Sequence, residues 1–518
     1  MRIELLWNLP KDRFLATLQQ VKSIQGRLFS PNTKTWSIPY SIPNIKLVKS
    51  FGFSLDETLS IAIDDKKWDI TEEPQARIDR SKLSVLPYEL RKYQLEAVRF
   101  AEANNWRCLI SLAPRMGKTV VSLCNNILHD VKRTLIVCPA SIKIIWRREI
   151  KKVLNKSATI LVGETPYPIE GEFVIINYDI LWVWKDYLHD FDYMILDESH
   201  NISNPTIYQK NPEDEKGSQV PVKCTNAALE LTKKIKQVVL LSGTPATGKT
   251  AQLQTQLSIF SSRFTNRYYF LNRYCDPQEG YFGMTYDGAT NIPELQYYMA
   301  PYVFRRTKEQ GFDQLPKEIH ETVPIEIDGA LYRKEIAELE KEMSHLTQDQ
   351  IDERLSKFES LSYTQKRGQL LQWVKDFLEL HDKLIIYCWH KVVANDLLTK
   401  LGKKAVMVNG EVSAKNKQAN IDRFNTDPKC KVFIGQISAV KEGISLYASD
   451  SALYAEFGGA NAGAIQQCNE RMWLPELDQK QFNFYYAVGE GTLEEKRMET
   501  LKERGDLLMK VLDIKRKV

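Results

Sequence analysis

The stretch SLAPRMGKTV, residues 111–120, follows the apolar run RCLI and contains Gly-Lys-Thr. An apolar strand, a short loop with Gly-Lys-Thr and a helix together are typical of a phosphate-binding loop, because backbone N–H groups at the helix start can cradle phosphate. A second stretch, SGTPATGKTA at 242–251, fits the pattern G-x-x-x-x-G-K-[ST] at every defined position from Gly243 to Thr250. The first has Leu112 in place of the leading glycine. The local sequence therefore does not decide which loop binds a nucleotide.

The stretch YMILDESH, residues 193–200, distinguishes the two loops. A phosphate-loop enzyme needs a later strand that ends in an acidic residue and holds Mg²⁺. Asp197 and Glu198 end such a strand downstream of the first loop. Downstream of the second loop no apolar run ends in such a pair, and Glu456 in ALYAEF stands alone. This order favours residues 111–120 as the nucleotide loop.

The chemistry assigns a role to each residue of this loop and strand. Gly117 begins the helix and Lys118 binds the β- and γ-phosphates. Thr119 and Asp197 hold Mg²⁺, and Glu198 orients and deprotonates the attacking water. A plain helix start at 117–119 is the alternative, and the matched acidic pair disfavours it.

The second Gly-Lys-Thr stretch is predicted not to bind nucleotide. Its SGT follows the strand after the acidic one, where it can sense the nucleotide and transmit its state. Ser242 and Thr244, together with His200 beside the acidic pair, are the predicted coupling residues.

Composition excludes several other classes of protein. The 518 residues suffice for two or three domains, and no apolar run approaches the roughly 20 residues of a membrane helix. Eight cysteines without a C-x-x-C pair favour a reducing compartment, and seven histidines form no metalloenzyme motif. The formal net charge of +5 permits a nucleic-acid partner only if the positive charge is local.

Two series of apolar strands alternating with helical stretches predict an α/β protein with two parallel-sheet lobes. The first series includes RCLISLA, RTLIVCP, FVIINY, YMILDE and VVLLSG, and the second KLIIYCWH, KAVMVNG, KVFIGQI, SALYAEF and FNFYYAV. We expect a small β-rich N-terminal module at 1–75, lobe 1 at 84–265, a helical bridge at 266–382, lobe 2 at 383–490 and a C-terminal helix at 491–518.

Three segments carry further local predictions. Residues 206–222 are polar and punctuated by Pro and Gly, which favours an exposed loop. The stretch TLEEKRMETLKERGDLLMKVL predicts an amphipathic helix with a solvated charged face. Apolar residues at 4-3-4-3 spacing predict another amphipathic helix: Tyr332, Ile336, Leu339, Met343 and Leu346.

In this order, GKT, DESH and LSGTP resemble motifs I, II and III of superfamily 2 helicases, and further stretches resemble the Swi/Snf-like DNA-dependent ATPases. ELRKYQLEAVRF resembles their Q-motif, which implies that Gln94 reads adenine. ISAVKEGISL resembles motif V, with Gly443 implied to contact ATP. QQCNERMW resembles motif VI, with Arg471 as the arginine that reaches the γ-phosphate. The resemblance covers about residues 86–500 and implies two RecA-like lobes that use ATP and Mg²⁺.

The same resemblance implies a set of DNA contacts. LIVCPASIKIIWRREI is similar to motif Ia, VIINYDIL to motif Ib and KLIIYCWHK to motif IV. The residues implied to contact DNA are Pro139, Ser141, Asn177, Tyr178, Trp389 and His390.

The predicted bridge resembles the HepA-related (HARP) annealing helicases. Four of its stretches carry the likeness: Arg273–Cys275, Gly288–Leu295, Arg305–Arg306 and Leu315–Lys317. IQGRLFSPNTKTWSIP in the N-terminal module is similar to the accessory domain of that branch, which implies DNA recognition by Arg27, Lys34 and Trp36.

The residues of that module also support a second interpretation. Pro31-Asn32 favours a turn, and Phe29, Trp36 and Ile38 form an alternating apolar face of a strand hairpin. A small packing module with Trp36 in its core therefore stands beside the fork-DNA role as an equal alternative.

Two positions depart from the family pattern. Arg115 stands where motif I of the family has a glycine, and Leu474 where motif VI has a second arginine. Loss of an arginine finger lowers turnover by orders of magnitude. We expect either that Arg115 compensates in part or that hydrolysis is slow.

The resemblance implies an ATP-dependent translocase on double-stranded or branched DNA that acts as an annealing helicase or fork-remodelling motor. An RNA-dependent ATPase of superfamily 2 and a degenerate ATP-gated DNA clamp with little turnover are the alternatives. We expect a monomer without a membrane segment, with single-stranded-DNA-binding or replication proteins as partners. The compact chain favours a phage or prokaryotic origin and hence a cytoplasmic location.

Overall fold

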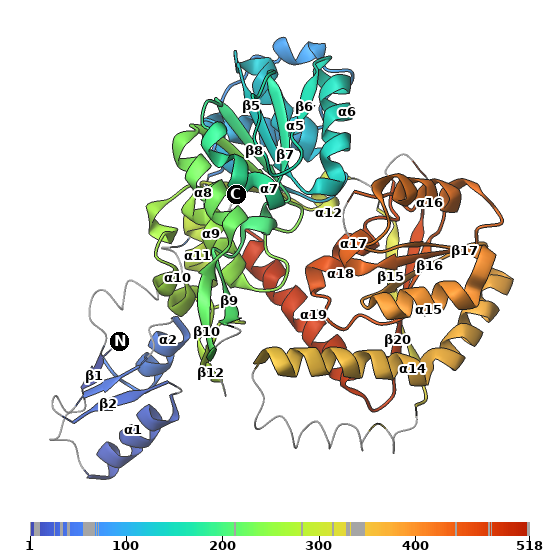
Figure 1. Ribbon diagram of the computed structural model, residues 1–518. Helices are drawn as coiled ribbons and strands as arrows, with labels where there is room; N and C mark the ends of the chain where they lie inside the picture. The colour runs from blue at the N-terminus through green and yellow to red at the C-terminus, as the bar shows by residue number, and fades with distance from the viewer. Residues whose placement is uncertain are drawn as a thin grey trace.

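The structure is a computed structural model. It describes residues 2–4, 11–24, 26–31, 35–38, 42–54, 68, 70, 72–211, 214–280, 283–312, 315–327, 332, 348–440, 443–474, 477 and 479–514. Figure 1 shows two large α/β lobes and a small N-terminal module. No helix among these residues has the length and apolar character that crossing a bilayer requires.

Lobe 1 is built on a seven-stranded parallel sheet in the order β14-β4-β11-β8-β5-β7-β6. Its strands are β4 (Arg107–Leu112), β5 (Thr134–Cys138), β6 (Ala158–Ile160), β7 (Phe173–Asn177), β8 (Tyr193–Asp197), β11 (Gln237–Leu241) and β14 (Val303–Arg306). Helices cover the sheet: α4 (Lys92–Ala103), α5 (Lys118–Leu128), α6 (Lys143–Leu154), α7 (Tyr178–Trp184), α8 (Lys223–Lys234) and α9 (Leu253–Ser258).

The strands of lobe 1 are apolar throughout because both faces of the sheet are covered. In β5, Leu135 and Val137 belong to one buried cluster, and Ile136 and Cys138 belong to the cluster on the other face. This two-residue alternation explains why the strands read as continuous apolar runs in the sequence.

Lobe 2 repeats the plan with a six-stranded parallel sheet in the order β15-β20-β19-β16-β18-β17. Its strands are β15 (Lys317–Ile325), β16 (Leu384–Cys388), β17 (Ala405–Val408), β18 (Val432–Gln436), β19 (Ser451–Tyr454) and β20 (Gln481–Gly489). Its helices are α14 (Gln348–Leu380), α15 (Lys391–Leu401), α16 (Ala414–Thr426), α17 (Ile437–Val440), α18 (Ala462–Asn469) and α19 (Leu493–Leu512). Buried clusters again lie on both faces. The predicted fold class, two parallel-sheet lobes, is confirmed.

The segment predicted as a helical bridge also supplies an edge strand to each sheet. β14 pairs with β4 in lobe 1, and β15 pairs with β20 in lobe 2. The segment contains α10 (Arg267–Tyr274), α11 (Ile292–Met299), α12 (Lys308–Gly311) and a hairpin of β12 (Gln278–Gly280) and β13 (Gly283–Thr285). Of the predicted helix with 4-3-4-3 spacing, Tyr332 is described and buried, and the other four positions lie outside the described residues.

The predicted exposed loop at 206–222 is wrong in part, because it forms an antiparallel hairpin of β9 (Thr206–Asn211) and β10 (Asp214–Pro221). Ile207 and Tyr208 pair with Val220 and Gln219, and the register shifts between Asp214 and Gly217. Val, Ile and Tyr favour extended pairing, and the irregularity falls where the sequence is most polar.

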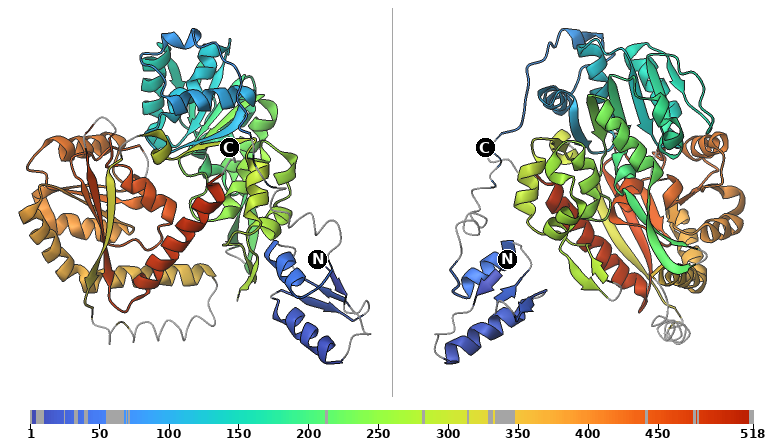
Figure 2. Two further views of the ribbon diagram at one scale, coloured as in Figure 1. Left: turned by 180° about the vertical axis from the view of Figure 1, so that it is seen from behind. Right: turned by 60° about the vertical axis from the view of Figure 1, so that its left-hand side comes forward.

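The N-terminal module has a three-stranded antiparallel sheet in the order β1-β3-β2, formed by β1 (Arg2–Glu4), β2 (Leu28–Ser30) and β3 (Thr35–Ser37). The predicted hairpin is confirmed as β2 and β3, and the helices α1 (Lys11–Ser23) and α2 (Ile42–Ser50) complete the module. Val21, Ile24, Ile38 and Val48 form its own small core. Both views in Figure 2 show the module apart from the two lobes.

Helix α19 joins the two lobes (Figures 1 and 2). Thr492 caps its first turn by accepting a hydrogen bond from the Glu494 N–H at 3.2 Å. Near this end, Lys366 of α14 is fully buried and binds Glu494 at 2.7 Å. At the other end, Val511 and Leu512 are buried in the core of lobe 1. The predicted amphipathic helix is confirmed: the apolar Val511 and Leu512 of its last turn are buried, and the charged Lys510 is exposed.

The buried pair of Lys366 and Glu494 gives a stability prediction. We expect Lys366→Ala to lower the free energy of unfolding by about 3–5 kcal/mol, because it leaves the Glu494 carboxylate buried without its partner. Lys391→Ala, which removes the exposed partner of Glu411, should cost less than about 1 kcal/mol. Denaturant unfolding measures both variants. Equal effects would show that the buried pair does not anchor α19.

Candidate nucleotide site between the two lobes

The candidate site forms at the carboxyl ends of three neighbouring strands of lobe 1. β11 lies between β4 and β8, with Leu241 opposite Ile110 on one side and opposite Asp197 on the other. Parallel strands present their carboxyl ends at one edge of the sheet, where α/β proteins bind ligands. The 111–119 loop, the acidic pair and the 242–247 loop therefore lie side by side.

The loop before α5 has the geometry of a phosphate loop. Gly117 caps α5 with a φ of 78°, a left-handed conformation that glycine adopts without strain. Lys118 folds back and donates a hydrogen bond from its Nζ to the Leu112 carbonyl at 3.0 Å. The N-terminus of α5 offers backbone N–H groups and a partial positive charge, which suit a phosphate.

Gln94 is buried beside this loop. Its Nε2 donates to the Met116 carbonyl at 3.0 Å, and its Oε1 accepts from the Arg91 N–H at 2.8 Å. A Cβ atom on Gly117 would lie 2.4 Å from the Gln94 Nε2, so the side chain needs glycine at this position. The predicted adenine-reading residue thus braces the phosphate loop.

Asp197 and Glu198 lie directly after β8, as predicted. Asp197 is almost buried, and its carboxylate accepts hydrogen bonds from the Trp146 Nε1 at 2.8 Å and the Glu198 N–H at 2.9 Å. Burial, and then the neighbouring Glu198 charge, raise the pKa of Asp197 to about 7, while the positive charge of Lys118 opposes the rise. The lysine and the acidic pair therefore act on one another electrostatically.

A chain of side chains leads from the acidic pair into lobe 2. The His200 Nδ1 lies 3.4 Å from the Glu198 Oε2 and 3.4 Å from the Ser242 Oγ. The Ser242 Oγ accepts from the Thr244 N–H at 3.2 Å, and the Thr244 Oγ1 accepts from the Gln467 Nε2 of α18 at 3.1 Å. The three predicted coupling residues thus lie between Glu198 and lobe 2.

The second Gly-Lys-Thr stretch is occupied by its own chain. The Gln252 Oε1 accepts hydrogen bonds from the N–H groups of Thr247, Gly248 and Lys249 at 2.7, 2.9 and 3.3 Å. These are the groups that a phosphate would need. The Lys249 Nζ binds Asp287 at 2.6 Å, and Asp287 also binds Arg504 of α19 at 2.9 Å.

Lobe 2 faces this site with the end of α18. The Arg471 Nε donates to the Gln467 carbonyl at 2.8 Å, so the helix end holds the guanidinium. Glu470, which the sequence did not single out, is buried at the same place and lies 3.6 Å from Lys308. Burial raises the pKa of Glu470, and the charges of Lys308, Arg471 and Lys118 oppose the rise. The sequence signal that could have identified Glu470 is its position directly before Arg471, the expected arginine finger.

Two further motif positions of lobe 2, Gly443 and Leu474, are both partly buried. Gly443 has a φ of 68°, and a Cβ atom there would lie 2.7 Å from Ile142 of lobe 1. It therefore contacts the 139–145 segment across the interface. Leu474 is partly buried, and its N–H donates to the Gln479 Oε1 at 3.0 Å.

The candidate DNA contacts divide into exposed and buried positions. Ser141 is exposed and Pro139 partly exposed, next to the interface with lobe 2. Asn177 is buried, and its Oδ1 accepts from the Lys143 Nζ at 2.8 Å. The Tyr178 hydroxyl donates to the Asp197 carbonyl at 2.8 Å. Asn177 thus holds Lys143 of the motif Ia segment in place, and Tyr178 holds the backbone of Asp197.

Trp389 and His390 surround the buried Glu456. The backbone N–H groups of both residues donate to the Glu456 Oε1 at 3.1 and 2.6 Å, and the His390 Nδ1 lies 2.6 Å from the Oε2. The Trp389 ring packs on Gly459, where a Cβ atom would come within 2.5 Å. The glutamate that stood alone in the sequence therefore organises the loop after β16.

The N-terminal candidates are only partly described. Arg27 is exposed, and its Nη1 donates to the Ile24 carbonyl at 3.1 Å. Trp36 is partly buried against the module's core, with its ring centroid 5.0 Å from that of Phe29. Lys34 lies outside the described residues.

The HARP-like stretches of the bridge pack against one another. Arg273 forms an ion pair with the buried Glu294, and the Tyr274 hydroxyl donates to the same carboxylate at 2.9 Å. The Asn291 Nδ2 donates to the Arg273 carbonyl at 2.7 Å. Arg306 binds Glu73 at 2.8 Å and Glu96 at 3.0 Å. These motif residues have structural roles in lobe 1.

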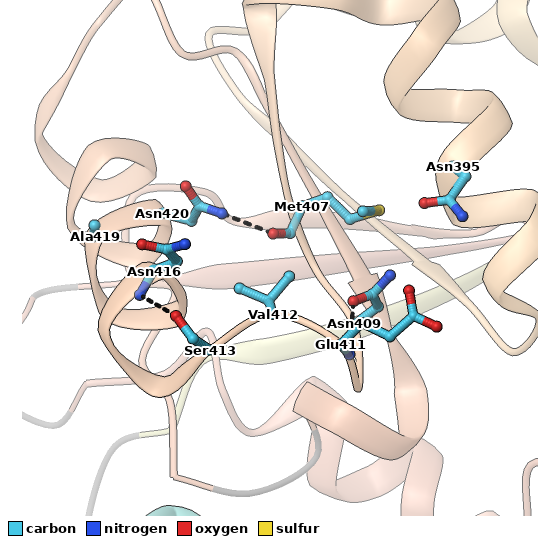
Figure 3. Close-up of a pocket in the computed structure, with 9 residues that line it drawn as sticks. All are labelled: Asn395, Met407, Asn409, Glu411, Val412, Ser413, Asn416, Ala419 and Asn420. Atoms are coloured by element: carbon cyan, nitrogen blue, oxygen red, sulfur yellow. Dashed lines mark hydrogen bonds between the residues drawn. The ribbon is translucent and has the colours of Figure 1, made fainter.

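A pocket of about 500 Å³ lies elsewhere, on lobe 2 between β17 and the helices α15 and α16 (Figure 3). Four asparagines dominate its lining, and the Asn420 Nδ2 donates to the Met407 carbonyl at 2.8 Å. Its residues include none of the predicted catalytic or nucleotide-binding side chains.

The two parallel sheets, with strand ends that converge at one interlobe surface, define the class of proteins with two RecA-like lobes. Comparison with protein families agrees. The SNF2-related domain matches residues 17–370, and the helicase conserved C-terminal domain matches residues 366–468. The chain belongs to the SNF2-related family, a family of DNA-dependent ATPases.

The individual relatives share about a quarter of their aligned residues with this chain. The chain is 26% identical over 513 residues to the SWI/SNF-related matrix-associated actin-dependent regulator of chromatin subfamily A-like protein 1 of Drosophila melanogaster, which covers 95% of this chain and 65% of that protein. It is 23% identical over 447 residues to the DNA annealing helicase and endonuclease ZRANB3 of Homo sapiens, which covers 80% of this chain and 39% of that protein. The chain thus spans less than two thirds of either relative.

A solved structure of the Sulfolobus solfataricus SWI2/SNF2 ATPase core in complex with dsDNA aligns with a TM-score of 0.38 and 17% sequence identity. The alignment covers 82% of this chain and 93% of that chain.

The two Gly-Lys-Thr loops give opposite predictions. Lys118→Ala should abolish ATP hydrolysis, because the phosphate loop loses its cation. Lys249→Ala, the matched control, should leave ATP affinity within about twofold of the wild type, since its Nζ serves Asp287. Titration with a fluorescent ATP analogue and a phosphate-release assay measure the two effects. Loss of binding in Lys249→Ala with binding retained in Lys118→Ala would reverse the assignment.

Proposed function

We propose that the chain couples ATP hydrolysis to movement along double-stranded DNA and acts as an annealing helicase or fork-remodelling motor. One observation carries the proposal: within a chain of the SNF2-related family, the phosphate loop, the acidic pair and the end of α18 meet at one interface between two lobes. The name of the second relative above, a DNA annealing helicase and endonuclease, supports the annealing function.

In this proposal each residue has one task at the bound nucleotide. Gly117 and Lys118 hold the phosphates, and Thr119 and Asp197 hold Mg²⁺. Bound Mg²⁺ would neutralise charge on the phosphates. The buried carboxylate of Asp197 and the oxygens of a threonine and of phosphates are the hard ligands that Mg²⁺ takes.

Glu198 orients the attacking water and accepts its proton. Its Oε2 is buried and, within the described part of the chain, accepts no hydrogen bond. A buried carboxylate oxygen without a hydrogen-bond partner is unusual in a folded protein, and a catalytic role is one explanation for it. Arg471 reaches the γ-phosphate from lobe 2, while Gln94 and Gly443 shape the site from either side.

The coupling path would transmit hydrolysis to the DNA surface. His200, Ser242 and Thr244 connect Glu198 to Gln467 of lobe 2. Gly443 packs on Ile142, next to the exposed Ser141 of the proposed DNA surface. A shift between the lobes would therefore move the 139–145 segment relative to lobe 2, which is the movement that translocation needs.

A local concentration of positive charge supports a polyanionic partner. A groove of about 480 Å³ on the outer side of α6 is lined by Arg147, Arg148, Lys151, Lys152 and Lys156. Lys156 pairs with Glu172, whereas Arg147, Arg148 and Lys151 make no ion pair within the described residues. Because the net charge of the chain is only +5, a nucleic-acid partner needs a surface where positive charge is concentrated, and the groove on α6 is such a surface.

Measuring ATP hydrolysis with no nucleic acid, with duplex DNA and with RNA tests the proposal. Duplex DNA should stimulate turnover most. Greater stimulation by RNA would favour an RNA-dependent ATPase. Binding of ATP and DNA with negligible turnover would favour the ATP-gated clamp, an alternative that the apolar Leu474 supports.

The relatives above come from animals and give no support to a phage or prokaryotic origin, so origin and cytoplasmic location stay predictions.

The groove on α6 gives a prediction about salt. Arg147→Ala/Arg148→Ala/Lys151→Ala should weaken duplex binding equally for all sequences. The slope of log affinity against log salt concentration should become shallower by about 0.9 for each phosphate that the variant no longer neutralises. Fluorescence anisotropy at several salt concentrations measures this slope. An unchanged slope would remove this face from the DNA surface.

The N-terminal module gives a prediction about branched DNA. A truncation for this purpose should keep Trp68 and Glu73, because Trp68 packs 5.6 Å from the rings of Tyr297 and Tyr298 and Glu73 binds Arg306. A chain that begins near residue 60 should keep duplex-stimulated hydrolysis and lose strand annealing and its preference for forks.

Arg27→Ala/Lys34→Ala in the full chain should reproduce that loss at an unchanged melting temperature. Trp36→Ala distinguishes DNA recognition from packing in the core of the module. If Trp36 contacts an unpaired base, the variant should lose about 1–3 kcal/mol of binding free energy for branched DNA. If Trp36 serves only packing, the variant should lower the melting temperature instead. If the truncated chain still anneals strands and prefers forks, the module serves packing alone.

A further inference from the structure

Arg115 extends from the phosphate loop of lobe 1 into lobe 2. Its Nη2 donates to the Ser445 Oγ at 2.7 Å and to the Arg471 carbonyl at 3.3 Å, and its Nε donates to the Glu470 carbonyl at 3.4 Å. The residues joined by these bonds lie 330 to 356 positions apart in the chain. This guanidinium therefore links the loop of Lys118 directly to the proposed arginine finger.

The backbone of Arg115 shows that this position is unusual. Its φ is 64°, a left-handed conformation that a residue with a Cβ atom adopts only at a cost in strain. The family pattern has glycine here, which would adopt the same backbone without strain. The chain thus keeps a long cationic side chain where the backbone favours glycine.

The contacts of Arg115 hold two segments of lobe 2 together. Ser445 belongs to the first segment, and Glu470 and Arg471 belong to the second. The Leu446 N–H donates to the Arg471 carbonyl at 2.8 Å, so the two segments are already joined next to the guanidinium. A planar guanidinium with several donors can bind such a group of oxygens in one fixed geometry. It therefore fixes the backbone from which the Arg471 side chain extends.

We propose that Arg115 is a positioning residue that holds Arg471 against the phosphate loop. Leu474 stands where the family has a second arginine and cannot make a charged contact between the lobes, and Arg115 makes such a contact instead. Arg115 acts through the backbone of residues 470–471 and takes no proton or phosphate itself. The inference rests on the proposed ATPase function for its kinetic test and on the interlobe contact alone for its structural test.

The kinetic test compares Arg115→Gly, Arg115→Lys and Ser445→Ala. Arg115→Gly places the family residue at this position and relieves the backbone strain. If the Arg115 side chain has no role in catalysis, this variant should therefore be at least as active and as stable as the wild type. A positioning role predicts instead a fall in kcat of about 10²-fold, the scale of a finger misplaced by about 1 Å, with the KM for ATP nearly unchanged. Arg115→Lys should recover part of kcat, because lysine keeps the charge and loses the planar fork.

Ser445→Ala removes the shortest of the three bonds and should fall between the wild type and Arg115→Gly. The double variant Arg115→Gly/Ser445→Ala should be no slower than Arg115→Gly alone, since both changes remove the same interaction. Arg80→Gly removes an exposed arginine outside the site and should change neither kcat nor KM.

The structural test uses hydrogen exchange in the nucleotide-free protein. Arg115→Gly should raise exchange in residues 443–474, including the Leu446 amide, and Arg80→Gly should not. A variant Arg115→Gly that matches the wild type in kcat, or that loses ATP binding as strongly as kcat, overturns the inference. If the wild type hydrolyses no ATP, the proposed function fails, and unchanged exchange in residues 443–474 would then overturn the interlobe contact separately.

Discussion

The parallel ladder of β4, β11 and β8 is the constraint on which the site depends. Backbone hydrogen bonds fix β11 between the other two strands, and the register sets Leu241 opposite both Ile110 and Asp197. The 111–119 loop, the acidic pair and the 242–247 loop leave the sheet at neighbouring positions for that reason. Buried apolar clusters cover both faces of this sheet.

The two Gly-Lys-Thr loops show how tertiary context separates similar sequences. Each follows a central strand of the same sheet. The first leads into α5, whose N-terminus suits an anion, and Lys118 lies close enough to Asp197 to affect its pKa. In the second, the Gln252 Oε1 already accepts from three backbone N–H groups. The Gln252 side-chain oxygen thus takes up the backbone N–H groups that a phosphate would need.

The interface between the lobes is made by residues that are far apart in the chain. Gln467 binds Thr244 across 223 positions, Gly443 packs on Ile142, and Arg115 reaches Ser445, Glu470 and Arg471. Helix α19 adds a packing contact, because its first turn is held in lobe 2 by the buried Lys366 and its last apolar residues are buried in lobe 1. Packed interfaces change between discrete arrangements, so a shift at this interface would move one lobe as a unit against the other.

The sequence by itself determined the two series of parallel strands, the hairpin of the N-terminal module and the order of the motifs, because these depend on local periodicity and on residues close to one another. It also identified Lys118, Asp197 and Glu198 as neighbours, since strand ends converge in any parallel sheet. Only the tertiary structure decided that 206–222 pairs as a hairpin, that β14 and β15 complete the sheets and that Asn177 and Tyr178 are buried. Only the tertiary structure revealed Glu470 and the reach of Arg115. The bonds of Arg115 join residues 330 to 356 positions apart in the chain, and no local pattern records such a partner.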